Sequence, residues 1–404
     1  MAVNLLPPDT LLPVAGVRIG TAAAEVKYAG RLDMALFEFC DGVDTGGVFT
    51  QSHFAAAPVV LARARQDGNR AWLINSGNAN AATGDLGQQD ASATCAEAAR
   101  YLQLAEQQVQ PFSTGVIGER LPLERMLKGI SACASDLRED GWMDAAQAIM
   151  TTDTVPKGQS VQFELDGQTI TMTGIAKGAG MIKPNMATML AYMACDANVA
   201  PGVAQMLVKD AVDLSFNRIT VDGDTSTNDC FMFACTGQVA HEVIDSRQHR
   251  LYPRLLEQVV QSARYLAQSL VRDGEGATRF VTIHVRGGAS QADCLAVAYT
   301  VAESPLVKTA LFAGDANWGR FCMAIGRAPV TELDPAKVAL WLDQVQVAAG
   351  GLMCASYTED AGAQVLAQDE FTVTIDLGLG QHEETVWTTD LSYEYIKINA
   401  EYRT

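Results

Sequence analysis

Short apolar runs separated by polar or glycine-rich breaks recur along the first half of the chain. Residues 58–65 (PVVLARAR) and 71–75 (AWLIN) have the length and character of buried strands. The glycine- and asparagine-rich segment 76–84 interrupts this pattern, and residues 90–105 have the spacing of an amphipathic helix. Further helices are predicted at about 121–133 and 139–150, so this half combines strands with helices.

Two alternating segments in the middle of the chain predict a β-hairpin. The sequences VQFELDG and QTITMTG each alternate with a period of two, and Asp166 and Gly167 stand where the turn is needed. Residues 188–197 (TMLAYMACDA) then form an almost unbroken apolar run of strand length. Such a run indicates a strand that is covered on both faces.

The second half alternates helices with strands. Helices are predicted at about 202–216 and 250–271, followed by a strand at 280–287, a helix at 291–304 and a strand at 371–378. No internal repeat is visible. The pattern predicts an α/β (α+β) fold, and a chain of 404 residues is long enough to form two or more compact units.

Composition and charge narrow the classes of partner. The chain has 29 Lys and Arg against 47 Asp and Glu, a formal net charge of −18, which argues against nucleic acid as a partner. No apolar run is long enough to span a bilayer, and the N-terminus has prolines but no basic residue before Arg18, unlike a secretory signal. We therefore expect a cytoplasmic protein with no membrane partner.

The cysteines and histidines give no metal or disulfide pattern. The nine cysteines are widely spaced without a CxxC pair, which is typical of free thiols in a reducing compartment. The five histidines form no HExxH motif or closely spaced cluster. We expect no bound metal and no resident cofactor.

The most unusual segment is GIAKGAGMIKPNMATMLAYMACDA at 174–197. Its glycines permit a close backbone approach, and the segment leads through Ala187 and Thr188 into the predicted buried strand. Considered alone, Thr188 suits the ordinary start of a strand, because β-branched residues favour strands. The glycines fit neither of the common phosphate-binding patterns, GxxxxGK[ST] and GxGxxG.

Within this segment, KGAGMIKPNMATML at 177–190 resembles the autoproteolytic junction of the ornithine acetyltransferase family. Eight further blocks resemble the family in the same order along the chain. They are GVFTQSHFAAAPVV at 47–60, NSGNANAATG at 75–84, STGVIGERLP at 113–122, MTTDT at 150–154, DGDTSTND at 222–229, DGEGATRF at 273–280, SPLVKTALFAGDANWGR at 304–320 and KINAEYRT at 397–404.

The resemblance implies a fold and a processing event. The implied fold has layered sheets with flanking helices, as in N-terminal-nucleophile enzymes, plus a smaller C-terminal α/β lobe. The implied cut lies between Ala187 and Thr188, which would give an alpha chain of residues 1–187 and a beta chain of residues 188–404. Two copies of each chain are the assembly that the family implies.

The resemblance also implies the catalytic groups. Thr188 is the nucleophile, and its freed α-amine, with an ordinary pKa of about 7.7 to 8, is the base. Nucleophile and base would then reside on one residue, which suits a chain with few histidines. The oxyanion of the tetrahedral intermediate would be bound by the hydroxyl of Thr114 and the backbone N–H of Gly115. Without the resemblance, Thr114 and Gly115 fit an ordinary turn equally well.

Matching blocks assign the substrate contacts. These are Thr154, Lys177, Thr188, Glu275, Asn399 and Thr404, with Thr151 and Thr152 as adjacent alternatives to Thr154. Lys177 suits the α-carboxylate of acetylornithine, and Glu275 or the terminal carboxylate of Thr404 suits its ammonium. Outside this context, Lys177 and Glu275 are typical of solvated loop and turn residues.

The implied reaction is acetyl transfer from N2-acetylornithine to glutamate through acetyl-Thr188, with ping-pong kinetics. The sequence leaves open whether acetyl-CoA is also a donor, which would make the enzyme bifunctional. Two alternatives remain. An N-terminal-nucleophile amidase or aminopeptidase would release the acyl group to water, and a non-catalytic amino-acid-binding protein would keep the fold without being cut.

Overall fold

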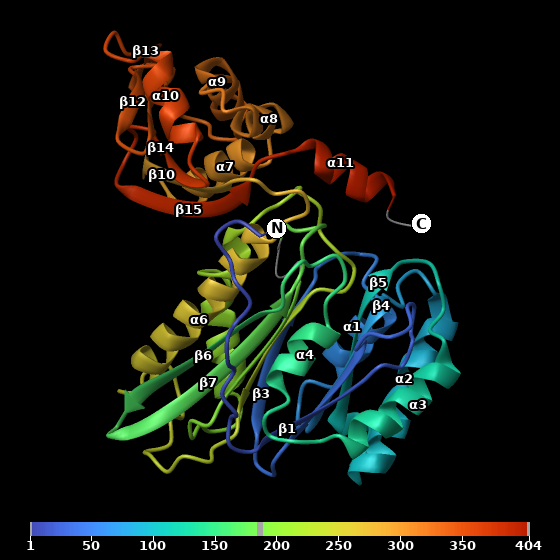
Figure 1. Ribbon diagram of the computed structural model, residues 1–404. Helices are drawn as coiled ribbons and strands as arrows, with labels where there is room; N and C mark the ends of the chain where they lie inside the picture. The colour runs from blue at the N-terminus through green and yellow to red at the C-terminus, as the bar shows by residue number, and fades with distance from the viewer. Residues whose placement is uncertain (1, 184–188, 402–404) are drawn as a thin grey trace. The chain divides into compact units, whose positions relative to one another are not determined.

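A computed structural model of the chain describes residues 2–183 and 189–401 and shows a mixed α/β fold (Figure 1). The chain divides into two compact units. The large unit contains Pro7–Asn217 and Asp224–Leu270. The small unit contains Met1–Leu6, Arg218–Gly223 and Val271–Thr404.

The large unit contains two sheets. The four-stranded sheet has the order β1-β2-β4-β5, in which only β4 and β5 are parallel neighbours. The five-stranded sheet has the order β3-β9-β8-β7-β6, in which only β8 and β9 are parallel neighbours. The strands of both sheets are β1 (Val17–Ala22), β2 (Met34–Phe39), β3 (Asp44–Phe49), β4 (Ala71–Asn78), β5 (Val109–Val116), β6 (Lys157–Leu165), β7 (Gln168–Lys177), β8 (Leu190–Cys195) and β9 (Cys230–Cys235).

Two predictions for the five-stranded sheet are confirmed. β6 and β7 form the predicted hairpin, with Asp166 and Gly167 at positive φ angles of 54° and 76° in the turn. β8 lies between β7 and β9, and all six of its residues are buried. The strand predicted at 188–197 is therefore covered on both faces.

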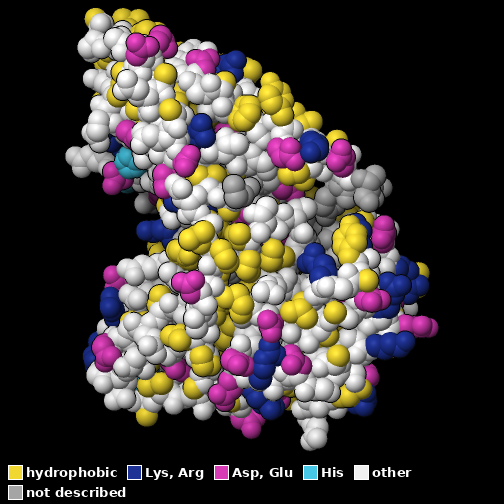
Figure 2. All heavy atoms as spheres, in the orientation of Figure 1, with side chains coloured by type: hydrophobic (Ala, Val, Ile, Leu, Met, Phe, Trp, Pro, Cys, Tyr) yellow, Lys and Arg dark blue, Asp and Glu magenta, His cyan; other side chains and the backbone are white. Residues whose placement is uncertain are grey.

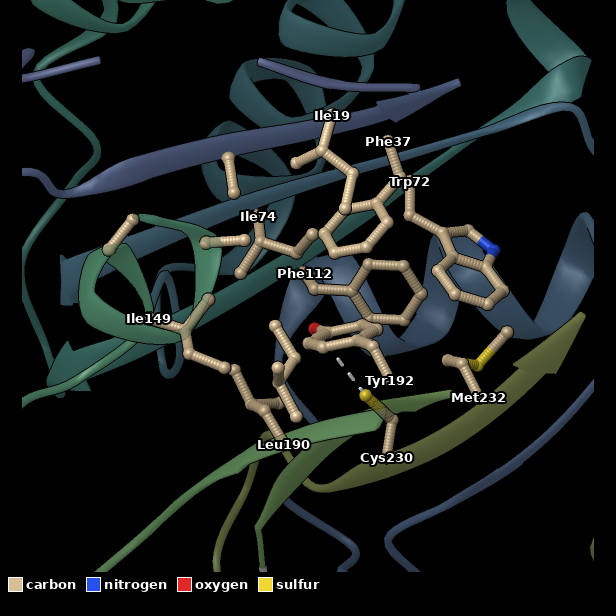
Figure 3. Packing of buried hydrophobic residues seen from close by; sticks show 14 of the residues in the cluster. Ile19, Phe37, Trp72, Ile74, Phe112, Ile149, Leu190, Tyr192, Cys230 and Met232 are labelled. Carbon is tan, nitrogen blue, oxygen red and sulfur yellow. Dashed lines mark hydrogen bonds between the residues drawn. The ribbon is translucent and has the colours of Figure 1, made fainter. Parts of the chain in front are cut away.

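The two sheets face each other across an aromatic core (Figure 3). Phe37, Trp72 and Phe112 come from the four-stranded sheet, and Tyr192 comes from β8. The ring centroid of Tyr192 lies 5.9 Å from that of Phe37, 5.7 Å from that of Trp72 and 5.3 Å from that of Phe112. Because rings from both sheets interdigitate, the sheets form two packed layers.

Helices pack around these two layers. α2 (Gly84–Leu102) and α3 (Leu123–Ser135) pack on the four-stranded sheet, and α5 (Val203–Val212) packs on β3 and β9. α6 (Tyr252–Arg272) lies against β7, and α4 (Trp142–Ala148) contacts β1 and β7. These helices confirm those predicted near 90–105, 121–133, 139–150, 202–216 and 250–271. Layered sheets with flanking helices are the fold class that the resemblance implied.

One predicted strand is wrong. Residues 58–65 form most of helix α1 (Ala57–Ala64). Pro58 stands in the first turn of this helix, where its fixed φ angle and missing N–H are tolerated. Val59 and Ala62 are buried while Val60 is exposed, which is helical spacing. The strand was predicted from the apolar run alone, and the proline at the start of that run was not taken into account.

The small unit has its own core and a six-stranded sheet of order β13-β12-β11-β14-β10-β15. This unit confirms the smaller C-terminal α/β lobe, including the predicted strands at 280–287 and 371–378 and the helix at 291–304. Its elements are β10 (Phe280–Gly288), α7 (Gln291–Ala302), α8 (Pro305–Ala313), α9 (Trp318–Gly326), β11 (Ala339–Leu342), β12 (Val345–Ala349), β13 (Leu352–Met353), α10 (Glu359–Leu366), β14 (Glu370–Asp376), β15 (His382–Thr389) and α11 (Tyr393–Ala400).

Two surface properties bear on partners. Within the part of the chain that the structure describes, no helix has both the length and the apolar character needed to cross a bilayer. On the face shown in Figure 2, acidic and basic side chains are interspersed, although acidic residues outnumber basic ones in the sequence.

Candidate active site

The two predicted oxyanion residues lie at the end of β5. Gly115 has a φ angle of 131° and stands in register with Gly77 on the parallel neighbour β4. A Cβ atom on Gly115 would lie 2.3 Å from the carbonyl carbon of Gly77. Glycine is therefore required at this position, both for the backbone angle and for the close approach of the two strands. Thr114 belongs to β5, so the alternative of an ordinary turn at 113–115 is wrong.

Buried amides fix the end of β5. The Asn228 side-chain amide donates to the carbonyl oxygen of Ser113, at 2.8 Å, and to that of Ala79, at 2.6 Å. The Ser113 hydroxyl donates to Asn75 Oδ1 at 2.7 Å. These bonds tie Ser113, the residue before Thr114, to β4 and to the loop that precedes β9, so the predicted oxyanion residues stand on a rigid support.

Lys177 is brought to Thr114 from a different sheet. It is the last residue of β7 and is 8% exposed. Its Nζ atom donates to Thr114 Oγ1 at 3.3 Å and to Thr151 Oγ1 at 2.8 Å. Two residues that the sequence suggested for separate roles, Thr114 for the oxyanion and Lys177 for the substrate, are therefore in contact.

A buried carboxylate, Asp153, supports this group. It accepts hydrogen bonds from Lys157 Nζ at 2.6 Å, from the backbone N–H of Gly178 at 2.7 Å and from that of Thr151 at 2.9 Å. Burial alone would raise the pKa of Asp153, but the charges of Lys157 and Lys177 outweigh that effect and hold the pKa well below its usual range. Asp153 is therefore ionised at neutral pH.

A second buried carboxylate has its pKa shifted in the opposite direction. Asp229 directly precedes β9 and is fully buried, and burial raises its pKa well above the usual range although the charge of Lys177 opposes the shift. Lys177 is thus close to two buried carboxylates whose pKa values are shifted in opposite directions.

Two predicted substrate residues meet in the small unit. The Asn399 side-chain amide, on α11, donates to Glu275 Oε2 at 2.8 Å, and Glu275 is 8% exposed. Asp390 fixes the loop that carries Glu275, because its carboxylate accepts from the backbone N–H of Thr278 at 2.9 Å and from that of Arg279 at 3.1 Å.

Below this loop lies a fully buried lysine that the sequence did not single out. Lys308, on α8, donates to Thr388 Oγ1 at 3.1 Å and to the carbonyl oxygen of Thr389, next to Asp390. Burial lowers the pKa of Lys308 from 10.5 to about 8, although the charges of Asp390, Asp222 and Glu303 oppose the shift.

Three of the remaining predicted residues fall outside the part of the chain that the structure describes. These are Ala187, Thr188 and Thr404. Thr154 is exposed, whereas Thr151, one of its two alternatives, contacts Lys177. The described chain resumes at Met189, whose carbonyl oxygen accepts from the N–H of Cys230 at 2.8 Å as the chain enters β8.

Sequence reasoning missed Asp153 as a site residue, although it lies inside the MTTDT block between Thr151 and Thr154. A buried acid next to two threonines gives no sign of its partners until the fold brings β7 beside it. Among residues 2–183 and 189–401, no group of three His, Cys, Asp or Glu side chains is arranged to hold a metal ion.

Comparison with known proteins shows the family of the chain that carries this site. The ArgJ family model matches residues 18–404. The arginine biosynthesis bifunctional protein ArgJ of Pseudomonas fluorescens strain Pf0-1 is 52% identical over 405 residues, with both chains covered completely. Its counterpart in Pseudomonas syringae pv. tomato is 50% identical, again over the full length of both chains. The chain belongs to the ArgJ family.

Every site residue named above lies within the match to the ArgJ family model. The resemblance to ornithine acetyltransferases is thereby confirmed. Among solved structures, the ArgJ protein of Bacillus halodurans is 32% identical, with a TM-score of 0.49, covering 51% of this chain and 95% of the other. The ornithine acetyltransferase of Mycobacterium tuberculosis, solved with ornithine, is 35% identical, with a TM-score of 0.38 and coverage of 43% and 94%.

Proposed function

We propose that this chain transfers acetyl from N2-acetylornithine to glutamate, giving ornithine and N-acetylglutamate in arginine biosynthesis. The observation that carries the proposal is the cluster of Thr114, Gly115 and Lys177 in a chain with full-length ArgJ relatives. The cluster offers a hydroxyl and a cation at one point, which suits a substrate that carries a carboxylate and passes through an oxyanion.

We infer that the chain first cuts itself. The Thr188 hydroxyl attacks the carbonyl carbon of Ala187, the peptide becomes an ester, and water hydrolyses the ester to leave a carboxylate on Ala187 and a free amine on Thr188. The products are chains of residues 1–187 and 188–404. The sheet order supports their lasting association, because β8 and β9 of the second chain lie between β7 and β3 of the first.

Acetyl transfer then reuses the same hydroxyl. The α-amine of Thr188 takes the hydroxyl proton, the oxygen attacks the acetyl carbonyl, and the amine returns the proton to the departing ornithine nitrogen. Glutamate attacks the acetyl ester in the second half-reaction and restores the free threonine. Thr114 and Gly115 would donate to the oxyanion in both halves. Ping-pong kinetics follow, since ornithine leaves before glutamate binds.

The substrate contacts carried over from the family are Thr154, Lys177, Glu275, Asn399 and Thr404. Thr151, whose hydroxyl accepts from Lys177, is a further candidate beside Thr154. Lys177 would bind the α-carboxylate shared by donor and acceptor. Glu275, whose side chain accepts from Asn399, would bind the ornithine ammonium.

Three further properties belong to this proposal. Acetyl-CoA is a second donor to be tested as a co-substrate, because the two Pseudomonas relatives are called bifunctional. Two of each chain form the assembly. The site of action is the cytoplasm, where free cysteines such as Cys195 and Cys235, whose Sγ atoms share a hydrogen bond at 3.6 Å, stay reduced.

The decisive experiment combines processing with transfer. Purified protein should run as two bands on a denaturing gel, and the fragment that begins at Thr188 should gain one acetyl group when quenched with N2-acetylornithine alone. Added glutamate should remove this label as N-acetylglutamate. Thr188→Ala should remain a single inactive chain. Release of free acetate without any dependence on glutamate would instead identify a hydrolase.

A further inference from the structure

The contact between Lys177 and Thr114 carries an inference about how the oxyanion site works. A lysine ammonium has three N–H donors and no acceptor, whereas a hydroxyl has one donor and two lone pairs. In the 3.3 Å contact, Lys177 must therefore donate and Thr114 Oγ1 must accept. One lone pair of Thr114 is thereby occupied, and the hydroxyl proton must point away from the ammonium.

The position of the ammonium is fixed from two directions. Its second hydrogen bond, to Thr151 Oγ1 at 2.8 Å, keeps Nζ beside Thr114. The backbone immediately after Lys177 is fixed because Gly178 donates to Asp153 at 2.7 Å. Asp153 is buried and ionised, so its negative charge also favours the charged form of Lys177.

We propose that Lys177, held by Thr151 and Asp153, is a positioning residue that orients and polarises the Thr114 hydroxyl as the oxyanion donor. Polarised by this ammonium, the hydroxyl becomes a stronger donor to the negative charge that develops at the acetyl oxygen. This role rests on the proposed function and adds to the carboxylate contact that the family resemblance assigns to Lys177. The two roles differ in their kinetic consequences.

A double-mutant cycle on kcat separates them. Thr114→Val removes the hydroxyl but keeps the shape, and Lys177→Met removes the ammonium but keeps the length. Each single variant should lower kcat by about 10- to 100-fold. In the Thr114→Val background, Lys177→Met should cost less than about 3-fold, because the group through which it acts has already been removed.

The result that overturns the inference is an equal fold-loss from Lys177→Met with and without the Thr114 hydroxyl. Equal losses, together with a raised KM for both substrates, would leave Lys177 as a carboxylate contact alone. Glu275→Gln serves as the matched control, since its known partner is Asn399. Its effect on kcat/KM for acetylornithine should multiply with that of Thr114→Val, and Lys177→Arg should recover part of the lost kcat.

Two arrangements keep the test decisive. If Lys177→Met fails to fold or to be cut, the same cycle is run with Thr151→Val, which removes only the 2.8 Å acceptor. That variant should lower kcat about 3- to 10-fold alone and less than about 2-fold with Thr114→Val. The self-cleavage rate of each precursor is a second readout. If the wild type cuts itself but transfers no acetyl group, the proposed function fails. The coupling between Lys177 and Thr114 can then still be measured on the self-cleavage rates of the same four proteins.

Discussion

Because of Lys308, we expect the stability of the small unit to change with pH in the alkaline range. Its ammonium is fully buried against Thr388 and Thr389, and burial lowers its pKa from 10.5 to about 8. In an unfolded chain the same lysine keeps its ordinary pKa. Between pH 8 and 10.5 the unfolded state therefore binds a proton that the folded state has lost, and folding becomes more favourable as pH rises through this range.

The magnitude follows from the two pKa values. The full shift of 10.5 − 8 corresponds to about 3.4 kcal/mol of cost to folding below pH 8, and this cost disappears above pH 10.5. Between pH 7 and pH 10 the difference is about 2.5 kcal/mol. In Lys308→Met, the charge is absent at every pH. The lost hydrogen bonds of Lys308 add a constant cost that does not depend on pH.

The assay compares urea unfolding of wild type and Lys308→Met at pH 7 and pH 10. Other alkaline groups, such as the buried cysteines and Tyr192, titrate in both proteins and cancel in the difference. We expect wild type to gain about 2.5 kcal/mol relative to the variant over this interval. Parallel pH dependences for the two proteins would show that Lys308 keeps its ordinary pKa when folded, and would refute the reasoning.

Three further outcomes are expected. Thr114→Val should lower kcat about 10²-fold with little change in substrate affinity; a loss of affinity with normal kcat would make Thr114 a substrate contact. Gly115→Ala should lower both the Tm and activity, measured by calorimetry and acetyl-transfer assay, because the new Cβ atom would lie 2.3 Å from the Gly77 carbonyl carbon; an unchanged Tm would contradict this. Glu275→Gln should raise KM for acetylornithine more than for glutamate, in initial-rate kinetics; equal increases would remove Glu275 from the ornithine ammonium.

The fold was predictable where the sequence shows a regular spacing of apolar residues or the residues typical of a turn. The hairpin around Asp166 and Gly167 and the buried strand β8 follow from local pattern alone. The helix at residues 58–65 did not follow from local pattern, because a short apolar run fits a strand or a helix equally well. The proline in the first turn of α1 favours the helix. Most of the strand order depends on pairings that no local pattern encodes.

Motif resemblance named candidate residues for the site but not the contacts between them. Motif resemblance pointed to Thr114, Gly115 and Lys177, and the register of β4 with β5 explains physically why position 115 must be glycine. The hydrogen bond from Lys177 to Thr114 joins residues from two different sheets, so it exists only after the layers have packed. Asp153 and Lys308 were missed for the same reason, because their importance comes from burial beside distant charges.

The strand order of the five-stranded sheet has a consequence for genetics. β8 pairs with β7 through six residue pairs on one side, and β9 pairs with β3 through six on the other. If the chain is cut before β8, neither half can leave without breaking a ladder on each side. Halves made by different ribosomes would then rarely exchange, so two alleles with defects in opposite halves should not complement each other within one active site.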